Sequence, residues 1–512
     1  MKSTHLSALL ITALLLAAST AIAQTAAGQT DLTGYWKFSS PTSGLDYLQL
    51  KQSGETITSV GRGSLAGTLH AGKLHLANGT DADATVYEAP VVAGDKFPAT
   101  RITHDGPWGG ADVGTLERVT EQEVHPARLP LPDLRDLPDN GLVRTPPMGW
   151  NSWNKFHDRF DDATVRGMAD AMVASGMAKA GYTYIIVDEG WSSSRDANGK
   201  ITGNSRFPDM KALADYVHSK GLKIGIYSSP GPQVCGGYQG SYGHEEEDAQ
   251  TFADWGYDYL KYDWCSAGGI YQFTWADIDG AYQKMGEALE KTRRPIVYSL
   301  CEYGAGDVWK WGAKAGGNLW RTTGDISDNW KSMERIGFAQ IDIATNAQAG
   351  HWNDPDMLEV GNGGMTPDEY RTHFSLWALL RAPLIAGNDL RTMTEETKSI
   401  LTNSEVIAID QDLEAKPVQL LSQQGLSEVL VRPLTGNAVA IGLFNRDDKP
   451  VEISFRWDSI HLFDNLGFGS RPPTVRDLWK HEVVPTTGDT FTATVPAHGV
   501  VLLQTTNGGR RR

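Results

Sequence analysis

The stretch Tyr259-Leu260-Lys261-Tyr262-Asp263 is a short run of β-forming residues that ends in a lysine, a tyrosine and an aspartate. Similar runs recur along the chain, separated by segments with the apolar spacing of helices. The eight predicted strands are Met148–Trp150, Tyr184–Val187, Lys223–Tyr227, Tyr259–Tyr262, Ile296–Leu300, Asn318–Arg321, Gly350–Asn353 and Leu384–Ala386. Eight strands alternating with helices over roughly 260 residues favour an α/β fold of the (β/α)₈ TIM barrel type. A doubly wound parallel sheet is the alternative, because alternation alone does not reveal whether a sheet closes.

Two of the intervening segments show why helices are expected there. In residues 163–177 the apolar residues that recur at helical spacing are Val165, Met168, Met172 and Val173. The segment 242–255 opens with the acidic turn Glu245-Glu246-Glu247. Negative charges stabilise the N-terminus of a helix, so this acidic turn predicts a helix start.

The segments on either side of the barrel have the composition of β-rich domains. Residues 31–120 contain short alternating runs separated by Gly and Asn-Gly turns, which predict a small all-β module. Residues 121–144 carry four prolines and many charges, and we expect a linker or a strap along a neighbouring domain. The barrel is assigned to 145–412, and the turn-rich residues 413–507 are expected to form an antiparallel β-sandwich.

Residues 1–23 have the pattern of a secretory signal peptide. Lys2 precedes an apolar stretch that begins at Leu6, and Ala21-Ile22-Ala23 supplies an A-x-A cleavage site before Gln24. The apolar stretch is shorter than the roughly 20 residues that a membrane-spanning helix needs. We therefore expect an exported protein, periplasmic or secreted after cleavage, without a membrane partner.

Composition narrows the classes of function. The chain has 512 residues, and at about 150 residues per domain this length suggests about three domains. Lys and Arg total 46 against 62 Asp and Glu, and the net charge of −16 disfavours nucleic acid and anionic membranes as partners. Only Cys235, Cys265 and Cys301 are present, which allows one disulfide and one free thiol in an oxidising compartment.

Chemically active side chains concentrate at the C-terminal ends of the predicted strands, the edge that holds the active site in TIM barrels. Nearly every strand delivers a carboxylate, an aromatic ring or both to this edge. Crowded acids raise one another's pKa unless cations lie among them, and Lys261 and Arg321 are the candidate cations. Carboxylates accept hydrogen bonds from hydroxyls and aromatic faces stack on C–H surfaces, so the edge suits a neutral polyhydroxyl ligand.

Sequence patterns of other chemistries are weak. The chain has no H-x-H pair, no H-E-x-x-H and no G-x-S-x-G. A partial P-loop from Gly67 to Lys73 is followed by Leu74 instead of Ser or Thr. Hydrolysis of a glycosidic bond by paired carboxylates, without a cofactor or a metal, is the chemistry that we expect.

Five stretches carry a resemblance to a known family: Thr145–Trp153, Gly240–Glu245, Tyr259–Asp263, Arg321–Ile326 and Trp352–Met357. Together they make residues from about 143 to 412 similar to the catalytic barrel of glycoside hydrolase family 27. This is the α-galactosidase and α-N-acetylgalactosaminidase family, also called melibiases. The C-terminal β-domain also fits the family, whereas the N-terminal module looks like an addition.

The resemblance implies a retaining double displacement. Asp263 would be the nucleophile that attacks C1, and Asp325 would be the acid/base that protonates the departing oxygen and then deprotonates water. Such a pair needs carboxyls roughly 5–5.5 Å apart that differ in protonation. Lys261 lies two residues before Asp263 on a strand, hence on the same face, and would keep that aspartate ionised.

The resemblance also implies which residues bind the sugar and which cysteines pair. Trp153 would stack beneath the sugar, and the other implied sugar-binding residues are Asp188, Tyr227, Lys261, Arg321 and Asp356. Glu302 matches a position near the 2-substituent, where a bulky acid favours galactose over N-acetylgalactosamine. Cys235 and Cys265 match a family disulfide, which leaves Cys301 free as a small buried side chain.

Two departures from the family pattern concern the substrate. The usual Asp-Asp-Cys-Trp is here Asp188-Glu189-Gly190-Trp191, and Trp264 stands where the family has Asn. Glu189 is expected at the end of the pocket that holds O4 and C6, where one added methylene could crowd the hydroxymethyl group. A methylene is worth about 1–3 kcal/mol of discrimination.

Three functions follow from these observations. The first is an exported enzyme that hydrolyses terminal α-D-galactosyl residues of oligosaccharides or polysaccharides. The second is a β-L-arabinopyranosidase with the same mechanism, because arabinopyranose is galactose without the hydroxymethyl group. The third is a non-catalytic glycan-binding protein, which the presence of both Asp263 and Asp325 disfavours.

Overall fold

A computed structural model describes residues 30–40, 45–60, 65–79, 84–92, 94–103, 110–271, 274–460, 474–486 and 488–506. The predicted signal peptide, residues 1–23, lies outside the described residues and stays a prediction. The chain divides into two compact units, Met1–Pro126 and Ala127–Arg512.

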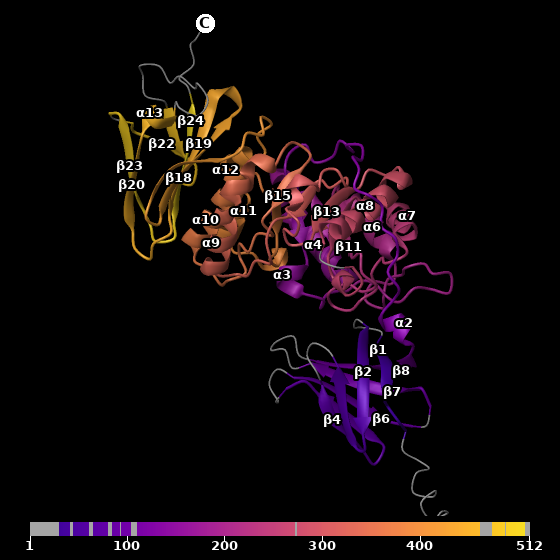
Figure 1. The fold of residues 1–512 in the computed structure, drawn as a ribbon. Coiled ribbons are helices and arrows are strands. Elements are labelled where there is room, and N and C mark those ends of the chain that lie inside the picture. The colour runs from indigo at the N-terminus through magenta and orange to yellow at the C-terminus, as the bar shows by residue number, and fades with distance from the viewer. Residues whose placement is uncertain are drawn as a thin grey trace, which may run out of the picture. The chain divides into compact units, whose positions relative to one another are not determined.

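The N-terminal unit contains a closed antiparallel β-barrel of eight strands, in which each strand pairs with the next and β1 with β8 (Figure 1). Its strands are β1 (Gly34–Ser39), β2 (Asp46–Ser53), β3 (Thr56–Val60), β4 (Ala66–His70), β5 (Lys73–Ala77), β6 (Thr85–Pro90), β7 (Lys96–Thr103) and β8 (Gly110–Val119). Alternate side chains point inward, and Trp36, Phe38 and Phe97 are among the apolar residues that fill the interior. The regular secondary structure described between residues 31 and 120 is all β-strand, as the sequence predicts.

The stretch expected as a linker or strap has two parts. Residues Glu121–Val124 form the short helix α2, which the sequence analysis did not expect. The helix forms because the first proline of the stretch is Pro126 and because Thr120 caps the helix, its hydroxyl accepting the Glu123 N–H at 3.2 Å.

Residues 127–144 run along the second unit as a strap. The Leu137 N–H donates to the Lys314 carbonyl at 2.8 Å, and the Arg135 guanidinium pairs with Glu287 at 2.9 Å. Arg128 forms a further ion pair with Asp277. The backbone hydrogen bond and the two ion pairs thus attach the strap to later segments of the second unit, to which residues 127–144 themselves belong.

The second unit is built on a curled sheet of eight parallel strands. They are β9 (Met148–Asn151), β10 (Tyr184–Ile186), β11 (Lys223–Ser228), β12 (Tyr259–Asp263), β13 (Val297–Cys301), β14 (Leu319–Arg321), β15 (Trp352–Asp354) and β16 (Leu384–Ala386). The order is β15-β14-β13-β12-β11-β10-β9-β16, so β16 lies beside β9. All eight fall on the strands predicted from the sequence.

The two outer strands of this sheet are linked through the segment that follows β15. Leu358 forms an isolated parallel bridge with Ala386 of β16. The Leu358 N–H donates to the Ile385 carbonyl at 2.8 Å, and the Gly387 N–H donates to the Leu358 carbonyl at 3.0 Å. Residue 358 therefore supplies the strand contact that β15 itself does not make.

Helices follow the strands of this sheet. They are α3 (Trp153–Phe156), α4 (Asp162–Ala174), α5 (Met177–Ala180), α6 (Met210–Ser219), α7 (Glu245–Trp255), α8 (Trp275–Thr292), α9 (Trp330–Phe338), α10 (Pro367–Leu380), α11 (Glu395–Leu401) and α12 (Ser404–Asp410). Helix α7 starts at the acidic turn, as predicted. On α4 the expected apolar face is buried except for Val173, which is 45% exposed.

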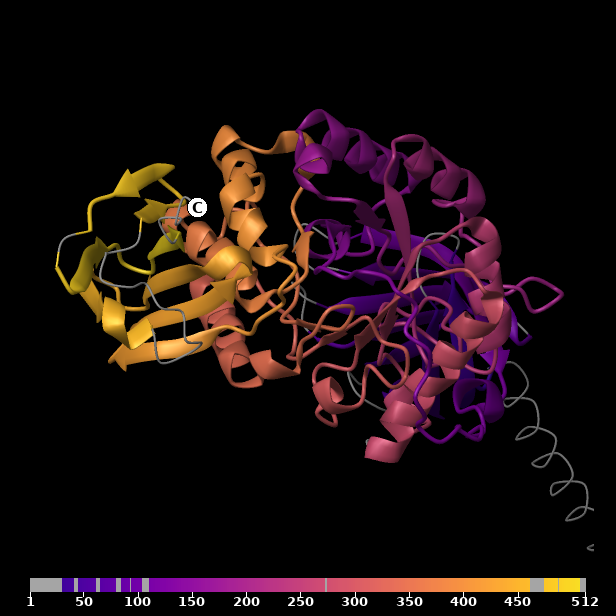
Figure 2. The same ribbon diagram turned by 90° about the horizontal axis from the view of Figure 1, so that it is seen from above.

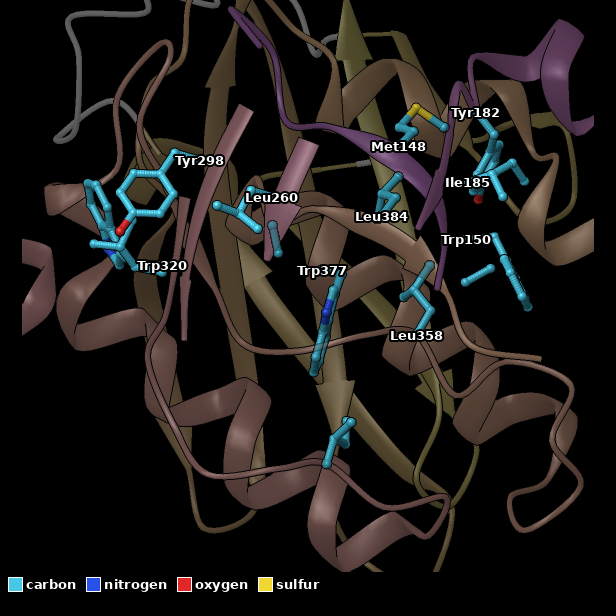
Figure 3. Packing of buried hydrophobic residues seen from close by; sticks show 14 of the residues in the cluster. Met148, Trp150, Tyr182, Ile185, Leu260, Tyr298, Trp320, Leu358, Trp377 and Leu384 are labelled. Carbon is cyan, nitrogen blue, oxygen red and sulfur yellow. The ribbon is translucent and has the colours of Figure 1, made fainter. Parts of the chain in front are cut away.

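Large side chains fill the space at the junction of the outer strands. Leu358 lies between Trp150 and Trp377 in Figure 3, and all three are fully buried. The Trp377 indole N–H donates to the Asp356 carbonyl at 2.8 Å, and that of Trp150 donates to the Asn388 carbonyl at 2.8 Å. The two indole hydrogen bonds thus hold the backbone of the loops after β15 and β16.

A β-sandwich follows the parallel sheet. One sheet has the order β17-β18-β19-β24-β21-β22 and the other pairs β20 with β23. The strands are β17 (Gln419–Gln424), β18 (Ser427–Leu434), β19 (Ala438–Asn445), β20 (Val451–Arg456), β21 (Thr474–Asp477), β22 (Glu482–Val484), β23 (Thr490–Val495) and β24 (Val500–Thr506). In Figure 2 these yellow strands lie beside the salmon and orange helices, in agreement with the contacts of α10 with β19 and β24. Within the described residues, no helix has the length and apolar character to cross a membrane.

Replacing Leu358 by alanine is expected to lower the free energy of unfolding by about 2–5 kcal/mol, because the change leaves a cavity beside Trp150 and Trp377. The control is Leu413→Ala, since Leu413 is 77% exposed. Guanidinium unfolding followed by tryptophan fluorescence measures both. Equal, small effects of the two changes would contradict this view of the junction.

Candidate active site

Side chains at the C-terminal ends of β9 to β15 line one pocket. The lining residues are Trp153, Asn154, Asp188, Glu189, Tyr227, Cys235, Lys261, Asp263, Tyr303, Arg321, Asp325, Ile326, Asp356 and Met357. Every catalytic or sugar-binding residue predicted from the sequence is among them except Glu302. The edge expected to carry the chemistry is therefore where the structure gathers these side chains.

Asp263 ends β12 and is held on both carboxylate oxygens. The Tyr227 hydroxyl donates to Oδ2 at 2.9 Å and the Tyr303 hydroxyl to Oδ1 at 2.7 Å. The residue is only 5% exposed. Burial raises the pKa of the Asp263 carboxyl, while the Lys261 ammonium and the two phenol hydrogen bonds oppose that rise.

Lys261 contacts Asp188, the acid that follows β10. Its Nζ lies 2.9 Å from Asp188 Oδ2, which also accepts the Asn151 side-chain amide at 2.7 Å. Burial by itself lowers the pKa of Lys261, but the carboxylates of Asp188 and Asp263 outweigh it and keep the pKa well above the usual value. The lysine therefore stays charged between two acids.

Glu189 lies in the pocket wall beside Asp188. Its Oε2 accepts the Gly236 N–H at 2.7 Å, and the residue is 2% exposed. Burial raises the pKa of Glu189 to about 8, with the charges of Asp188 and Asp263 adding to the rise. The hydrogen bond from the Gly236 N–H therefore holds the Glu189 carboxyl in the pocket wall.

The predicted disulfide joins Cys235 to Cys265, two residues after Asp263, and Cys301 is free and buried. The Tyr227 hydroxyl lies 3.2 Å from the Cys265 sulfur. Among the described residues, Cys235, Asp263 and Cys265 have the spacing of a metal site. Both sulfurs are engaged in the disulfide, so neither is a thiolate ligand.

Arg321 ends β14 and binds two carboxylates. Its Nη2 lies 3.0 Å from Asp325 Oδ1 and 2.9 Å from Asp356 Oδ2. The Asp356 Oδ2 atom also accepts the Ile326 N–H at 2.9 Å. Asp356 has a φ of 99°, a left-handed backbone conformation that a non-glycine residue adopts at an energetic cost. The ion pair with Arg321 and the hydrogen bond from Ile326 offset this energetic cost.

The two predicted catalytic aspartates have unlike surroundings. Asp263 is buried and hydrogen-bonded on both oxygens, whereas the Asp325 side chain is 63% exposed and pairs with Arg321. Such an asymmetry lets two carboxyls take different protonation roles in one site. Trp153 completes the pocket from the start of α3, held by its N–H donating to Asn151 Oδ1 at 2.8 Å.

Glu302 lies outside the pocket, contrary to the position near the sugar that the resemblance implies. Cys301 pairs with Asp263 in the sheet and shares its inward face, so the next residue points outward. The Glu302 carboxyl is fully buried, and burial raises its pKa well above the usual value. Tyr303 lines the pocket in place of Glu302. Its backbone has a φ of 61°, in the left-handed region.

Sequence reasoning missed four residues of the pocket wall: Asn154, Tyr303, Ile326 and Met357. Each is next to a residue that the motifs did single out. Tyr303 lies two residues beyond the end of β13, where the strand period no longer applies. Ile326 and Met357 lie inside matched stretches, but no pattern in the sequence distinguishes them, or Asn154, as pocket residues.

The two departures from the family pattern are accommodated locally. At Gly190, where φ is 101°, the carbonyl accepts Arg206 at 2.9 Å, and Arg206 also contacts the Tyr238 hydroxyl at 2.8 Å. Tyr238 in turn donates to Asp158 Oδ2 at 2.8 Å, which ties together the loops after β9, β10 and β11. Trp264 stacks against Tyr282 of α8, outside the pocket.

A parallel barrel that gathers acids around two buried cations, followed by a β-sandwich, is the arrangement of carboxylate-based glycoside hydrolases with a TIM-barrel fold. Residues 145–412 match the family model described as alpha galactosidase A, and residues 424–505 match its C-terminal beta sandwich domain. The chain belongs to glycoside hydrolase family 27, the alpha-galactosidase family.

Named relatives agree with this assignment. The chain is 46% identical over 368 residues to the alpha-galactosidase of Cyamopsis tetragonoloba, covering 71% of this chain and 87% of that one. It is 44% identical over 381 residues to alpha-galactosidase A of Cellvibrio japonicus, covering 71% and 92%. The crystal structure of alpha-galactosidase I from Mortierella vinacea has a TM-score of 0.69 at 39% identity, covering 72% of this chain and 98% of that one.

Two further structures extend the comparison, the second of them to the N-terminal unit. A β-L-arabinopyranosidase from Geobacillus stearothermophilus has a TM-score of 0.63 at 23% identity, covering 72% and 98% of the two chains, a likeness in fold alone. A Bacteroides fragilis structure, 30% identical with a TM-score of 0.67, covers 92% of this chain and 91% of its own. That coverage exceeds what Ala127–Arg512 provides, so the likeness extends into the N-terminal unit.

Replacing Glu189 by glutamine is expected to flatten the dependence of stability on pH. The pKa of Glu189 is about 8 in the folded chain against a usual 4.5, so the stability it contributes is complete below pH 4.5 and is lost as pH rises to about 8. The loss is about 1.4 kcal/mol per pH unit within that window. Denaturant unfolding at pH 5 and pH 8 measures it.

The control for this prediction is Glu395→Gln, because the Glu395 side chain is 93% exposed. The wild type and this control should lose more stability than Glu189→Gln between the two pH values. Parallel losses in all three proteins would show that Glu189 titrates as an ordinary carboxyl.

Proposed function

We propose that the chain hydrolyses terminal α-D-galactosyl residues from galactosides by a retaining double displacement that uses Asp263 and Asp325. The observation that carries this proposal is the single pocket that holds both aspartates in a chain 46% identical to an alpha-galactosidase. Oligosaccharides and polysaccharides are the proposed substrates, and one relative has been crystallised with raffinose.

In the first step Asp263 attacks C1 and the bond from C1 to the leaving oxygen breaks, while Asp325 gives that oxygen a proton. In the second step water attacks C1, its proton passes to Asp325 and Asp263 leaves as a carboxylate. The buried Asp263, with Lys261 as its neighbouring cation, suits the nucleophile. The exposed Asp325 suits proton exchange with the leaving group and with water.

The remaining polar side chains would hold the sugar hydroxyls. Asp188 and Asp356 are each paired with a cation, and their carboxylate oxygens are suited to accept hydrogen bonds from the sugar hydroxyls. Trp153 supplies an aromatic surface for the C–H face of the sugar. We assign the binding and hydrolysis of the sugar to a domain that spans residues 145–412. An N-terminal module at 31–120 and its linker at 121–144 precede this domain, and a sandwich at 413–507 follows it. Export after removal of residues 1–23 belongs to the same proposal.

Asp263→Asn is expected to lower turnover of p-nitrophenyl α-D-galactopyranoside by at least about 10³-fold, because an amide cannot form the glycosyl-enzyme. Asp263→Gly should regain turnover with added azide, which takes the place of the nucleophile. The matched control is Asp342→Asn, a change in the 3₁₀ segment Ala339–Asn346, away from the pocket. Full activity of Asp263→Asn would refute the assignment, and a wild type inactive on every glycoside would favour the glycan-binding alternative.

A second candidate function is β-L-arabinopyranosidase activity, and the position of Glu189 favours it. The side chain is fixed in the pocket wall by Gly236 and is longer than the aspartate typical of the family. Arabinopyranose lacks the hydroxymethyl group and needs less room at that wall.

Glu189→Asp is expected to move the ratio of kcat/KM for α-galactoside over β-L-arabinopyranoside towards galactose by about 10-fold, since one methylene is removed. Both p-nitrophenyl glycosides are assayed side by side, with Glu428→Asp as a control, because Glu428 is buried in the β-sandwich and does not line the pocket. An unchanged ratio in Glu189→Asp would exclude Glu189 as the specificity residue.

A further inference from the structure

Tyr303 is a pocket residue to which neither the motifs nor the mechanism above gives a role. Its hydroxyl lies 2.7 Å from Asp263 Oδ1, on the oxygen opposite the one that accepts Tyr227. Asp263 therefore has a phenol donor on each carboxylate oxygen. A hydrogen bond to an ionised group is stronger than one between neutral groups.

Three features of the structure constrain the position of the Tyr303 ring. The residue has a φ of 61°, in the left-handed region that strains a non-glycine backbone. Gly304 follows with a φ of 83°, and a Cβ there would lie 2.3 Å from the Thr322 carbonyl oxygen, so the turn packs closely against Thr322 and has no room for a side chain at residue 304. The Arg321 guanidinium lies 5.7 Å from the ring centroid, within cation–π range.

We propose that Tyr303 is a catalytic residue whose hydroxyl stabilises the Asp263 carboxylate as it leaves the glycosyl-enzyme. The inference rests on the proposed function, since it takes Asp263 as the nucleophile. In this step the water oxygen bonds to C1 and the bond between C1 and Asp263 breaks. The electron pair of that bond returns to Asp263, and the water proton passes to Asp325.

The phenol acts differently on the two halves of the reaction. An ester oxygen accepts a weaker hydrogen bond than a carboxylate oxygen does. The Tyr303 hydrogen bond is therefore strongest in the free enzyme and in the transition state that regenerates Asp263. It favours hydrolysis of the glycosyl-enzyme and gives no help to its formation.

The same contact has a consequence for pH. Hydrogen bonds from Tyr303 and Tyr227 lower the pKa of Asp263 against the effect of burial. Removing one donor must raise the pKa of that carboxyl. The other charged or titratable groups around it are Asp188, Glu189, Lys261, Cys301, Glu302, Arg321, Asp325 and Asp356. Tyr303→Phe leaves all of them in place.

The test is Tyr303→Phe, assayed on whichever p-nitrophenyl glycoside the wild type hydrolyses better. We expect kcat to fall about 10- to 100-fold, KM to fall with it, and kcat/KM to change much less. A burst of nitrophenol equal to the enzyme concentration should appear, since the glycosyl-enzyme accumulates. The acidic limb of the kcat/KM profile should move to higher pH.

The matched control is Tyr298→Phe. Tyr298 lies on β13 as well, is fully buried, and donates its hydroxyl to the Tyr282 carbonyl outside the pocket. This control should keep wild-type kcat, KM and pH profile. Thermal unfolding of both variants shows whether each remains folded.

The outcomes separate this inference from the proposed function. If Asp263→Asn abolishes turnover while Tyr303→Phe keeps wild-type kcat and pH profile, the role of Tyr303 is refuted and the nucleophile stands. An equal fall in kcat and kcat/KM without a burst would also refute it, because it marks a structural role only. Full activity of Asp263→Asn would refute the proposed function itself.

Discussion

Two buried cations, Lys261 and Arg321, are the constraint on which the rest of the pocket depends. Carboxylates from several strands meet there, and a buried carboxylate without a partner costs several kcal/mol. Lys261 lies against Asp188, and Arg321 against Asp325 and Asp356. Lys261 stands on β12 and Arg321 on β14 of one parallel sheet, and each offsets the charge of the acids that it contacts, whereas the pKa of Glu189 is raised to about 8.

The architecture serves this arrangement of charge. Parallel strands present all their C-terminal ends at one edge, so residues far apart in sequence share one pocket. The junction between the outer strands is the weak point of such a sheet. There Leu358 bonds to β16 while Trp150 and Trp377 pack around it, which holds Asp356 and its loop in place.

Two residues of the pocket wall, Glu189 and Tyr303, have side chains held by specific hydrogen bonds. The Glu189 carboxyl accepts the Gly236 N–H, one residue after Cys235 of the disulfide, and is buried in the pocket wall. Tyr303 adds a second phenol to the nucleophile. We propose that Glu189 acts on the choice of sugar and that Tyr303 acts on the balance between the two chemical steps, so that different residues control these two properties.

The sequence by itself determined the eight parallel strands, the edge that carries the acids and the identity of the family, because strand patterning and motifs are local. It also indicated the pairing of Cys235 with Cys265 through resemblance. Only the tertiary structure decided that Tyr303 and not Glu302 faces the pocket, and that Leu358 links the outer strands. The physical reason is that the backbone conformation beyond a strand end depends on contacts with other loops, such as Gly304 against Thr322, which no local pattern encodes.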